Sequence, residues 1–367
     1  MLQKTLRRIL GFALLLYGST ALAFTLITIP QEQVSPSNTI TDSTTLETQV
    51  QPIAGTIRAQ LLSLRRPKAA AKVALVGSML AANAHASSRS DVDYLAAAGS
   101  SGAGTGSGDS ASLWISVASN SLENEFSRTA FHGNTNNLLA GFDLTRSDKY
   151  VLGIAVGHEA SNYVTTFNAG NEKTQGFNAN PYFALLLSDT WSLDLILGYG
   201  QFNTRQSRTM GSIVPLATVA VDSEFEAKRG FVSTNLTNVS TWGDWKLTGS
   251  LGYLGSRREQ DAYVESNGSV VASAKQTSKQ WNLLGEAAYG RGNAETFVGA
   301  MYENTRDPQK VVFATGEQPA NDPDSVLLTA GWRYVGKGLT GSFVFSSRQA
   351  QKQVTEYGFS MMLRVDL

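Results

Sequence analysis

Cysteine is absent from the sequence, histidine is scarce, and neither sign of charge is in excess. The 367 residues include no Cys, three His, and 30 basic against 30 acidic side chains. Without Cys the chain has no disulfides and no thiolate metal ligands, which fits an exported protein. Balanced charge gives no reason to expect nucleic acid as a partner. The three histidines, His85, His132 and His158, do not stand at metal-ligand spacing, so no metal site and no cofactor are predicted.

Long apolar runs are also missing, except at the N-terminus. Three basic residues within the first eight precede the apolar run from Ile9 to Leu16, and small residues lead to Ala21-Leu22-Ala23. This order is typical of a signal peptide, here residues 1–23, and predicts Sec export. An uncleaved membrane helix is the alternative, because apolar residues resume from Phe24 to Ile29. The interruption from Gly18 to Thr20 favours cleavage.

The last eleven residues alternate strictly between apolar and mostly polar side chains. One face of such a strand carries Tyr357, Phe359, Met361, Leu363, Val365 and Leu367, and the other carries Gly358, Ser360, Met362, Arg364 and Asp366. About ten residues of a tilted strand cross a bilayer, so the pattern is typical of a transmembrane β-strand. Backbone amides in lipid must all be paired, and strands achieve this only in a closed barrel. We therefore expect an all-β protein with many more strands upstream.

Short turns recur through residues 113–367 at intervals of roughly 40 to 55 residues. Five of them contain the Gly, Asp or Asn that tight connections favour: Ser147-Asp148-Lys149, Ser188-Asp189-Thr190, Trp242-Gly243-Asp244, Gly290-Arg291-Gly292-Asn293 and Gly336-Lys337-Gly338. Five hairpins give ten strands, and a first strand over about 111–120 plus the C-terminal strand make twelve. The predicted fold is a 12-stranded antiparallel transmembrane β-barrel, with its short turns on the periplasmic side.

The strands beside these turns indicate which face meets lipid. Leucines at 193, 195 and 197 occupy one face of their strand, and a slip that turned Lys246 or Arg364 toward lipid would cost about 2 to 4 kcal/mol. Aromatic residues near the short turns predict an interfacial girdle: Tyr150, Trp191, Trp242, Trp245, Tyr289, Trp332 and Tyr334. Further along the chain, Asp222, Glu224, Glu226 and Lys228 are predicted to line the lumen. A soluble β-sandwich is the alternative fold, but its strands are usually shorter.

Residues 24–98, which precede the predicted barrel, have a different character. After a polar stretch, apolar residues at spacings of three and four predict one helix: Leu46, Val50, Ile53, Ile57, Leu61 and Leu64. Pro52 fits its first turn, Pro67 ends the pattern, and an Ala-rich stretch over 69–82 suggests a second helix. We slightly favour a marginal helix or helical hairpin over a segment that lies in or beneath the barrel. Residues 99–112 form a Gly/Ser linker that marks the domain boundary.

Several stretches of the predicted barrel carry a resemblance to a known family. They are Gly141-Phe142-Asp143, Ser147-Asp148, Gly153 and Gly157, Gly198-Tyr199-Gly200, and the run from Gly252-Tyr253 through Arg258-Glu259-Gln260 and Ala262-Tyr263 to Ser266-Asn267-Gly268 and Val270. In these the chain resembles the outer-membrane β-barrel domain of autotransporters, the type V secretion translocators. The resemblance implies twelve strands, insertion through the last strand and transfer of an N-terminal passenger to the cell surface. The implied partners of a monomeric barrel are outer-membrane lipid, the barrel assembly machinery and periplasmic chaperones.

The chain departs from that family in two places. It ends in Leu367, where an aromatic residue is more usual, although the preceding alternation is intact. The passenger-like segment 24–98 is short and lacks the repeated strands of a β-helical passenger. The family also implies a helix that threads the lumen, whereas here the helical stripe is separated from the first strand by the Gly/Ser linker.

Chemistry-bearing residues are sparse, and the sequence predicts no catalytic site. Gly108-Asp109-Ser110 is similar to the nucleophile block of a lipase family carried by some autotransporters, but it lies in the linker and no Asp-x-x-His follows it. The favoured hypothesis is a translocator or surface anchor for an N-terminal segment. The alternative is a diffusion pore or structural barrel whose N-terminal segment is periplasmic or plugs the lumen. A rim hydrolase that uses His132 or His158 is the third and least favoured hypothesis.

Overall fold

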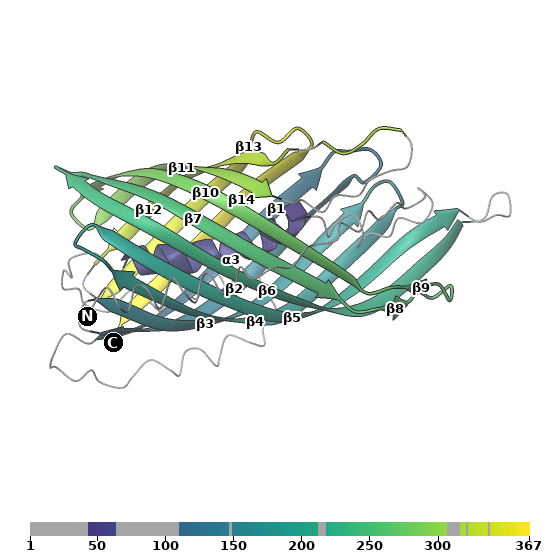
Figure 1. Ribbon diagram of the computed structural model, residues 1–367, viewed down its shortest axis with the longest axis horizontal. Helices are drawn as coiled ribbons and strands as arrows, with labels where there is room; N and C mark the ends of the chain where they lie inside the picture. Colours follow the sequence, from purple (N-terminus) through teal and green to yellow (C-terminus); the bar gives the residue numbers. More distant parts are fainter. Residues whose placement is uncertain are drawn as a thin grey trace.

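A closed ring of strands is the architecture of the protein. The computed structural model describes residues 43–63, 110–146, 149–211, 218–306, 316–320, 322–336 and 338–367. Within these residues, twelve antiparallel strands close into one barrel, shown in Figure 1. Each strand follows its predicted alternation, so successive side chains point into the lumen and out of the barrel. The predicted fold class is confirmed.

Strands that are consecutive in the chain lie side by side, and β1 closes the ring by pairing with β14. The barrel strands are β1 (Ser110–Asn124), β2 (Phe131–Arg146), β3 (Tyr150–Thr165), β4 (Gly170–Leu186), β5 (Trp191–Gly211), β6 (Thr218–Trp242), β7 (Trp245–Gln260), β10 (Ala274–Arg291), β11 (Ala294–Arg306), β12 (Asp324–Val335), β13 (Leu339–Gln349) and β14 (Val354–Asp366). In the β7–β10 connection, β8 (Tyr263–Val264) and β9 (Val270–Val271) form a separate two-stranded sheet. Because β1 begins at Ser110, the last residues of the predicted linker belong to the barrel.

The short turns gather at one end of the barrel and the longer connections at the other. Two-residue turns join β6 to β7 and β10 to β11, where Gly243 and Gly292 adopt positive φ angles of 58° and 64°. Both angles lie in the left-handed region that tight hairpins need and glycine tolerates. The predicted turn at Ser147-Asp148 falls outside the described residues. We call the two ends of the barrel the turn end and the loop end.

Polarity across the wall is the reverse of that in a soluble protein. Leu195 and Leu247 point outward with 40% and 47% of their surface exposed, whereas Asp194, Glu159 and Arg364 are buried on the inner side. A β-sandwich would bury those leucines in a shared core, so this alternative is excluded. Apolar residues outside and polar residues inside are typical of a barrel that sits in lipid.

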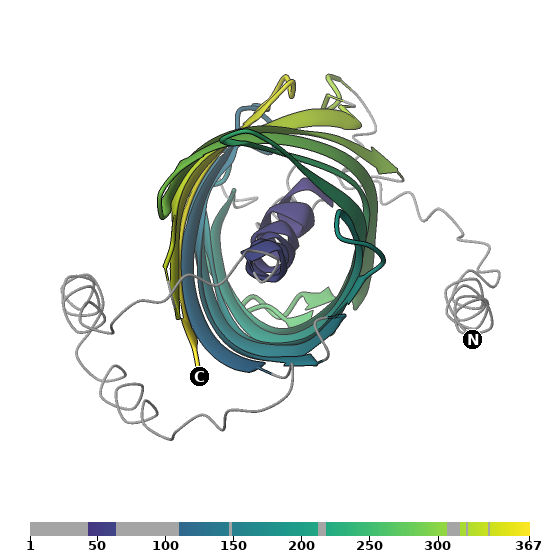
Figure 2. The ribbon, with the colours of Figure 1, turned by 90° about the vertical axis from the view of Figure 1, so that its left-hand side faces the viewer.

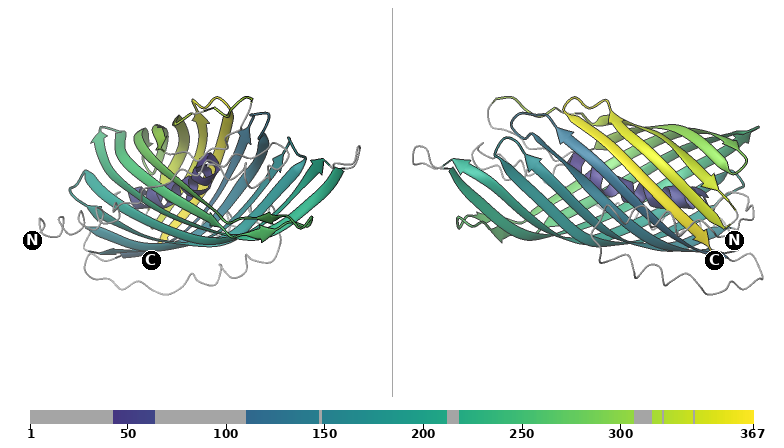
Figure 3. Two further views of the ribbon diagram at one scale, coloured as in Figure 1. Left: turned by 45° about the vertical axis from the view of Figure 1, so that its right-hand side comes forward. Right: turned by 180° about the vertical axis from the view of Figure 1, so that it is seen from behind.

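One side of the wall is taller than the rest. Strands β5 and β6 have 21 and 25 residues, against 12 and 11 for β12 and β13. The long teal and green strands extend past the others at the loop end in Figure 3. There Phe225 stacks on Tyr263 with ring centroids 4.5 Å apart, and Arg208 pairs with Glu265 at 2.8 Å. These contacts hold the segment that contains β8 and β9 against the inner face of the tall wall.

The helix α3 (Ser43–Ser63) lies inside the barrel, surrounded by the wall on all sides in Figure 2. The predicted helical stripe is confirmed as far as Leu61, while Leu64 and the suggested second helix over 69–82 fall outside the described residues. Two expectations are wrong. The helix lies within the lumen and not outside the barrel, and Pro52 lies in its middle and not in its first turn. The helix therefore begins well before Pro52, and polar contacts with the wall hold this earlier part of α3 in place.

Candidate functional site

The lumen and the helix that fills it form the candidate functional site. The apolar stripe of α3 is buried against inward-facing residues of the wall: Leu46, Val50, Ile53, Ile57 and Leu61 pack in one cluster with Trp114, Leu139, Val151, Ala155, Tyr182, Ala184, Ile196, Phe231 and Leu254. Fully burying an aliphatic side chain of this size contributes about 1.5 to 3 kcal/mol. The middle of the lumen is therefore a small hydrophobic core, shared by the helix and the barrel.

Arg348 is the centre of a charged network around the half of the helix that is nearer the loop end. Its guanidinium, 2% exposed, forms ion pairs with Glu303 and with Glu356, the latter at 2.7 Å. It also donates hydrogen bonds to the Ser325 hydroxyl at 3.0 Å and to the side-chain oxygen of Gln51 in α3. Gln51 in turn donates to Glu303. One arginine of β13 thus joins its own strand and three others, β11, β12 and β14, to the helix.

The carboxylate of Glu47 in α3 accepts hydrogen bonds from side chains of the barrel wall. It receives hydrogen bonds from Ser278, from Gln280 at 3.4 Å and from the Thr305 hydroxyl at 3.1 Å. The carboxylate is 4% exposed, so these bonds replace the water it loses on burial. Its position in the lumen is therefore fixed by groups from β10 and β11.

A second arginine of the wall bonds the helix from the opposite side. Arg229 of β6 forms a buried ion pair with Glu159 of β3 and donates to Gln49 of α3 at 2.7 Å. The guanidinium carbon also lies 4.3 Å above the centre of the Phe202 ring, a cation–π arrangement. Such fixed partners leave the helix little freedom to rotate about its axis.

At the turn end a chain of hydrogen bonds fixes the last turn of α3. Gln60 donates to Asp143 at 2.5 Å, and Asp143 also accepts from Ser112 at 3.1 Å and from the Tyr182 hydroxyl. The indole of Trp114 completes the chain by donating to Tyr182 at 3.0 Å. Asp143 is paired with Ser112 near the beginning of β1. The C-terminal end of the helix therefore lies at the same end of the barrel as the start of the first strand.

These contacts give the direction of the helix. Thr48, near its N-terminal end, donates to Glu356 at 3.2 Å, and Glu356 is paired with Leu122 near the end of β1. Gln60, near its C-terminal end, reaches the beginning of β1 through Asp143. α3 thus runs from the loop end to the turn end, antiparallel to β1.

Arg58 is the one position of α3 where a charge is buried with incomplete hydrogen bonding. Its Nε and Nη2 atoms have no hydrogen-bond partner among the described residues. The acidic groups whose charges reach it are Asp194 and Glu286. Glu286 is itself paired with Arg333 at 2.6 Å. Among the described residues, the guanidinium is balanced by the charges of these carboxylates and not by a direct ion pair.

The residues predicted from the sequence lie on the outside of the barrel. The apolar set of the last strand points outward, and its neighbour Arg364 is buried on the inner side with Met362. The predicted girdle aromatics stand at the turn end, with Trp191, Trp242, Trp245, Tyr289 and Trp332 exposed and Tyr150 and Tyr334 half-buried. Their side chains are thus placed where a girdle would need them.

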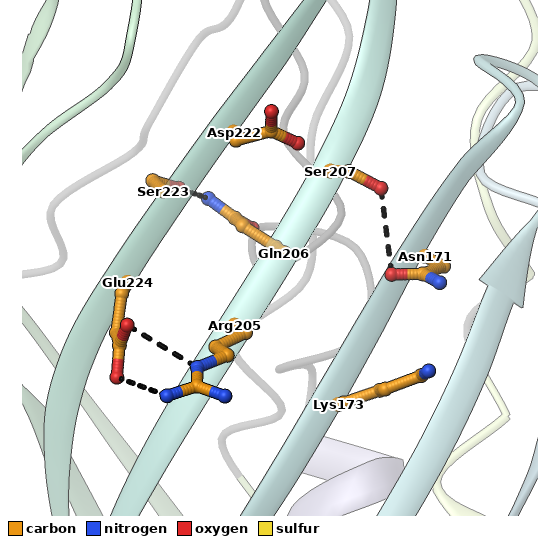
Figure 4. Close-up of a pocket in the computed structure, with 8 residues that line it drawn as sticks. All are labelled: Asn171, Lys173, Arg205, Gln206, Ser207, Asp222, Ser223 and Glu224. Atoms are coloured by element: carbon orange, nitrogen blue, oxygen red, sulfur yellow. Dashed lines mark hydrogen bonds and ion pairs between the residues drawn. The ribbon is translucent and has the colours of Figure 1, made fainter.

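The predicted lumen charges require a correction. Asp222, Glu224 and Glu226 are exposed on the outer face of the tall wall, and Lys228 lies half-buried on the same face. Figure 4 shows Glu224 bound to Arg205, beside a shallow pocket that Asp222 and Lys173 also line. The inward positions of this part of β6 are Val221, Phe225 and Ala227. Apolar residues face inward here because the segment of β8 and β9 covers them.

A second set of outward aromatic residues lies toward the loop end, and sequence reasoning missed it. Each is the last large apolar residue before its strand becomes polar on the outer face: Phe177, Tyr199, Tyr253, Trp281, Tyr302, Phe345 and Tyr357. The Tyr253 and Trp281 rings, on neighbouring strands, lie 5.0 Å apart. The signal in the sequence was the change from apolar to polar outward residues partway along each strand.

The histidines do not assemble a catalytic or metal site in the part of the chain that the structure describes. His158 faces outward with its ring 5.0 Å from Phe177, and His132 is exposed near the start of β2. Within the described ranges, no three His, Cys, Asp or Glu side chains are grouped so that they could hold a metal ion. Likewise, no described helix has both the length and the apolar character needed to cross a membrane. His85 and Asp109 fall outside the described residues.

The barrel is closed, its outer surface is apolar, and its lumen holds a helix among polar side chains. These features place the protein in the class of transport barrels of the outer membrane. Comparison with known families narrows this class. Residues 113–331, more than half of the chain, match the family model described as the autotransporter beta-domain. The chain belongs to the autotransporter beta-domain family, and its barrel is a translocator barrel of the outer membrane.

Solved structures show the same architecture at low sequence identity. The translocator domain of the autotransporter NalP from Neisseria meningitidis has a TM-score of 0.56 and 14% identity, over 71% of this chain and 89% of that chain. The beta domain of the Bordetella autotransporter BrkA has a TM-score of 0.55 and 16% identity, over 70% of this chain and 100% of that chain. At such identities the similarity concerns the fold alone. No curated protein matches the sequence.

Proposed function

We propose that the barrel anchors and exports only the short stretch that precedes α3, residues 24–42, while α3 itself stays in the lumen as a plug. The direction of the helix is the observation that carries this proposal. Its N-terminal end lies at the loop end, next to Glu356, so the chain before Ser43 continues from that side. In barrels of the outer membrane the long loops face outward. The exported segment is therefore shorter than the whole of residues 24–110.

Retention of α3 is supported by the bonds that it makes with the wall. Glu47, Gln49, Gln51 and Gln60 each have a partner on a barrel strand, and all are buried or half-buried. Removing the helix would leave several of these wall partners unpaired, at about 1 to 3 kcal/mol for each neutral group that stays dry. The helix acts as a built-in part of the folded barrel.

The route to the membrane is part of the same proposal. A signal peptide over residues 1–23 directs Sec export, periplasmic chaperones hold the chain, and the barrel assembly machinery inserts it as a monomer. The outward apolar face of β14 supports insertion through the last strand, since Phe359, Leu363 and Val365 share that face while Ser360 and Arg364 lie on the other. The aromatics at the turn end act as the periplasmic girdle.

Epitope accessibility on intact cells tests the proposal. An epitope inserted after Ser37, ahead of α3, should be labelled by antibody on intact cells. An epitope inserted after Ser88, between α3 and β1, should be labelled only after permeabilisation, because the helix ends and β1 begins at the periplasmic end. Labelling of the second site alone on intact cells would reverse the orientation and overturn the proposal.

A second candidate is a diffusion pore that stays open beside α3. Gly55 of the helix is exposed within the barrel, and a Cβ atom added there would meet nothing within 4 Å, so the plug leaves space along one face. Planar-bilayer conductance of the full chain and of a variant that lacks residues 43–63 separates the two. A plugged translocator predicts small conductance that rises sharply on deletion. Equal, large conductance of both proteins would favour the pore.

A further inference from the structure

The helix α3 packs against one half of the barrel wall and leaves the other half partly uncovered. All wall members of its apolar cluster come from β1 to β7, and each of these strands contributes at least one. Every inward position of β7 from Thr248 to Gln260 is buried, whereas every inward position of β12 from Leu327 to Val335 is half-buried. Protein interiors are otherwise close-packed, so this exposure marks space that the described helix does not fill.

One face of the helix is correspondingly uncovered. Gly55 is exposed, and four further residues of α3 at spacings of three and four are half-buried: Pro52, Thr56, Ala59 and Leu62. Such spacings place residues on one side of a helix. Gln51 belongs to the same side and bonds Arg348 of β13. The uncovered face therefore points toward the strands that α3 leaves uncovered.

We call the space between this face and the inward residues of β11, β12 and β13 the vestibule. Its wall includes Met301, Thr329 and Ser346, one from each strand, and all three are half-buried. On β12 the half-buried inward positions continue to Val335, the last residue of the strand. The vestibule therefore reaches the turn end of the barrel.

Toward the loop end the vestibule stops at the network around Arg348. We call this layer the constriction, and it consists of four buried wall residues and one residue of the helix: Glu303, Ser325, Arg348, Glu356 and Gln51. On β11 the layer is one inward residue thick, because Met301 on one side of Glu303 and Thr305 on the other are both half-buried. Loss of the bonds that Gln51 makes across it would connect the vestibule with the loop end.

Negative charge is in excess at the constriction. Glu303 and Glu356 share one guanidinium, that of Arg348. Along the vestibule, in contrast, each basic group has an acidic counterpart: Arg333 pairs with Glu286 at 2.6 Å, Lys246 pairs with Glu295 at 2.7 Å, and Arg58 lies within the field of Asp194. An ion that follows this path therefore meets its uncompensated charge at the narrowest point.

We propose that the vestibule and the constriction form a passage for small inorganic cations such as K⁺ beside the plug. The proposal rests on the retention of α3 in the lumen, as proposed above. Acidic side chains around a narrow part of a pore select cations, because they attract them and repel anions where hydration is reduced. Gln51 limits the flow, since its bonds to Arg348 and Glu303 close the layer.

Ion selectivity of the purified full-length chain in planar bilayers tests the proposal. Under a KCl gradient, the reversal potential of the wild type should show that K⁺ passes severalfold more readily than Cl⁻. E356Q should remove most of this preference. The geometry is kept, because Thr48 and Arg348 both donate to Oε2 of Glu356, a position that the amide oxygen of Gln can take. If E356Q fails to fold, E303Q gives the same readout.

The matched control replaces a buried carboxylate on the far side of the barrel. Glu172 of β4 is buried like Glu356, and β4 lies opposite β12 in the ring of strands. E172Q should keep the wild-type preference for K⁺. An equal loss of selectivity in E172Q and E356Q would overturn the proposal, as would a full-length chain that prefers Cl⁻ or carries no current. The epitope experiment tests retention of the plug separately.

Thiol labelling locates the path. The chain contains no Cys, so an introduced Cys is its single thiol. S346C, on the vestibule side of Arg348, should react with a cationic methanethiosulfonate reagent, and the current should fall. S250C, at a buried inward position of β7, should remain unmodified under the same conditions. Modification of both at equal rates, or of S250C alone, would place the path elsewhere and contradict the proposal.

Discussion

Replacement of Arg348 by Ala should destabilise the barrel more than any other single change of an ion pair in the described chain. Arg348 is buried and bonds two carboxylates, those of Glu303 and Glu356, while it also reaches Gln51 of the helix. Truncation leaves both carboxylates in a dry lumen without their counter-ion. Breaking a buried pair in this way costs about 3 to 5 kcal/mol.

The matched control is the same change in an exposed pair. Arg205 and Glu224 form an ion pair on the outer face with 70% and 49% of their side chains exposed. Exposed pairs contribute little to stability because water and salt screen them, so R205A should leave the free energy of unfolding close to that of the wild type. Both substitutions remove one arginine from a contact with glutamate, and they differ mainly in burial.

Guanidinium unfolding of the lipid-embedded barrel, followed by Trp emission, measures the two free energies. R348A should lower the free energy of unfolding by several kcal/mol, and in planar bilayers it should raise conductance because the bond to Gln51 is lost. Combining R348M with E303Q and E356Q removes the charges together and should restore most of the stability. Equal effects of R348A and R205A would refute the reasoning, as would a failure of the triple change to recover stability.

Three smaller predictions follow from single positions. G55A should raise the free energy of unfolding by about 0.5 to 1 kcal/mol, measured by the same titration, because Ala is the better helix former and its Cβ meets nothing. G153A should lower it by about 1 to 3 kcal/mol, since the new Cβ would lie 2.2 Å from the Tyr182 ring. The hydrogen bond from Arg205 holds the pKa of the Glu224 carboxyl below its ordinary value of 4.5, so R205Q should raise that pKa in an NMR titration. Because the folded pKa is the lower one, the contribution of Glu224 is present above pH 4.5 and is lost on acidification through the folded pKa.

Most of the barrel could be predicted from sequence because two local signals repeat along it. Alternation at period two gives the strands, and residues such as Gly243 and Gly292 give the turns that tight hairpins need. Together they lead to twelve strands without knowledge of any long-range contact. The outward direction of Leu195 and Leu247 also follows, since only one face of their strands is apolar along its whole length.

The error at Asp222, Glu224 and Glu226 has a physical reason. The period-two spacing of these residues predicts that they share one face of the strand. Whether that face points into the lumen or outward depends on what surrounds the strand. The reversed polarity holds only where the outer face meets lipid. Beyond that height both faces meet water or protein, and Phe225 turns inward to stack on Tyr263. The expectation applied the membrane rule to the part of β6 that lies above the membrane.

The position of α3 inside the lumen also could not be predicted from local sequence patterns. A stripe of apolar residues at helical spacing shows that one face is buried but does not identify what buries it. The partners are residues such as Asp143, Glu303 and Arg348, far away in the chain. The clue available in the sequence lay on the other faces of the helix, where neutral amides such as Gln49 and Gln60 recur in place of the charges expected of a helix in water.

The lumen contacts of α3 are of two kinds, and each kind has a different effect on the helix. Apolar packing, as at Ile53 and Ile57, is non-directional, so a helix shifted by one turn, about 5.4 Å, could regain much of it. The polar bonds tolerate no such shift, because Arg348 and Asp143 are fixed in the wall and each reaches one residue of the helix, Gln51 and Gln60 respectively. Apolar contacts thus hold the plug in the barrel, while the polar contacts determine where along the barrel axis it stops, and with it which residues remain beyond the loop end.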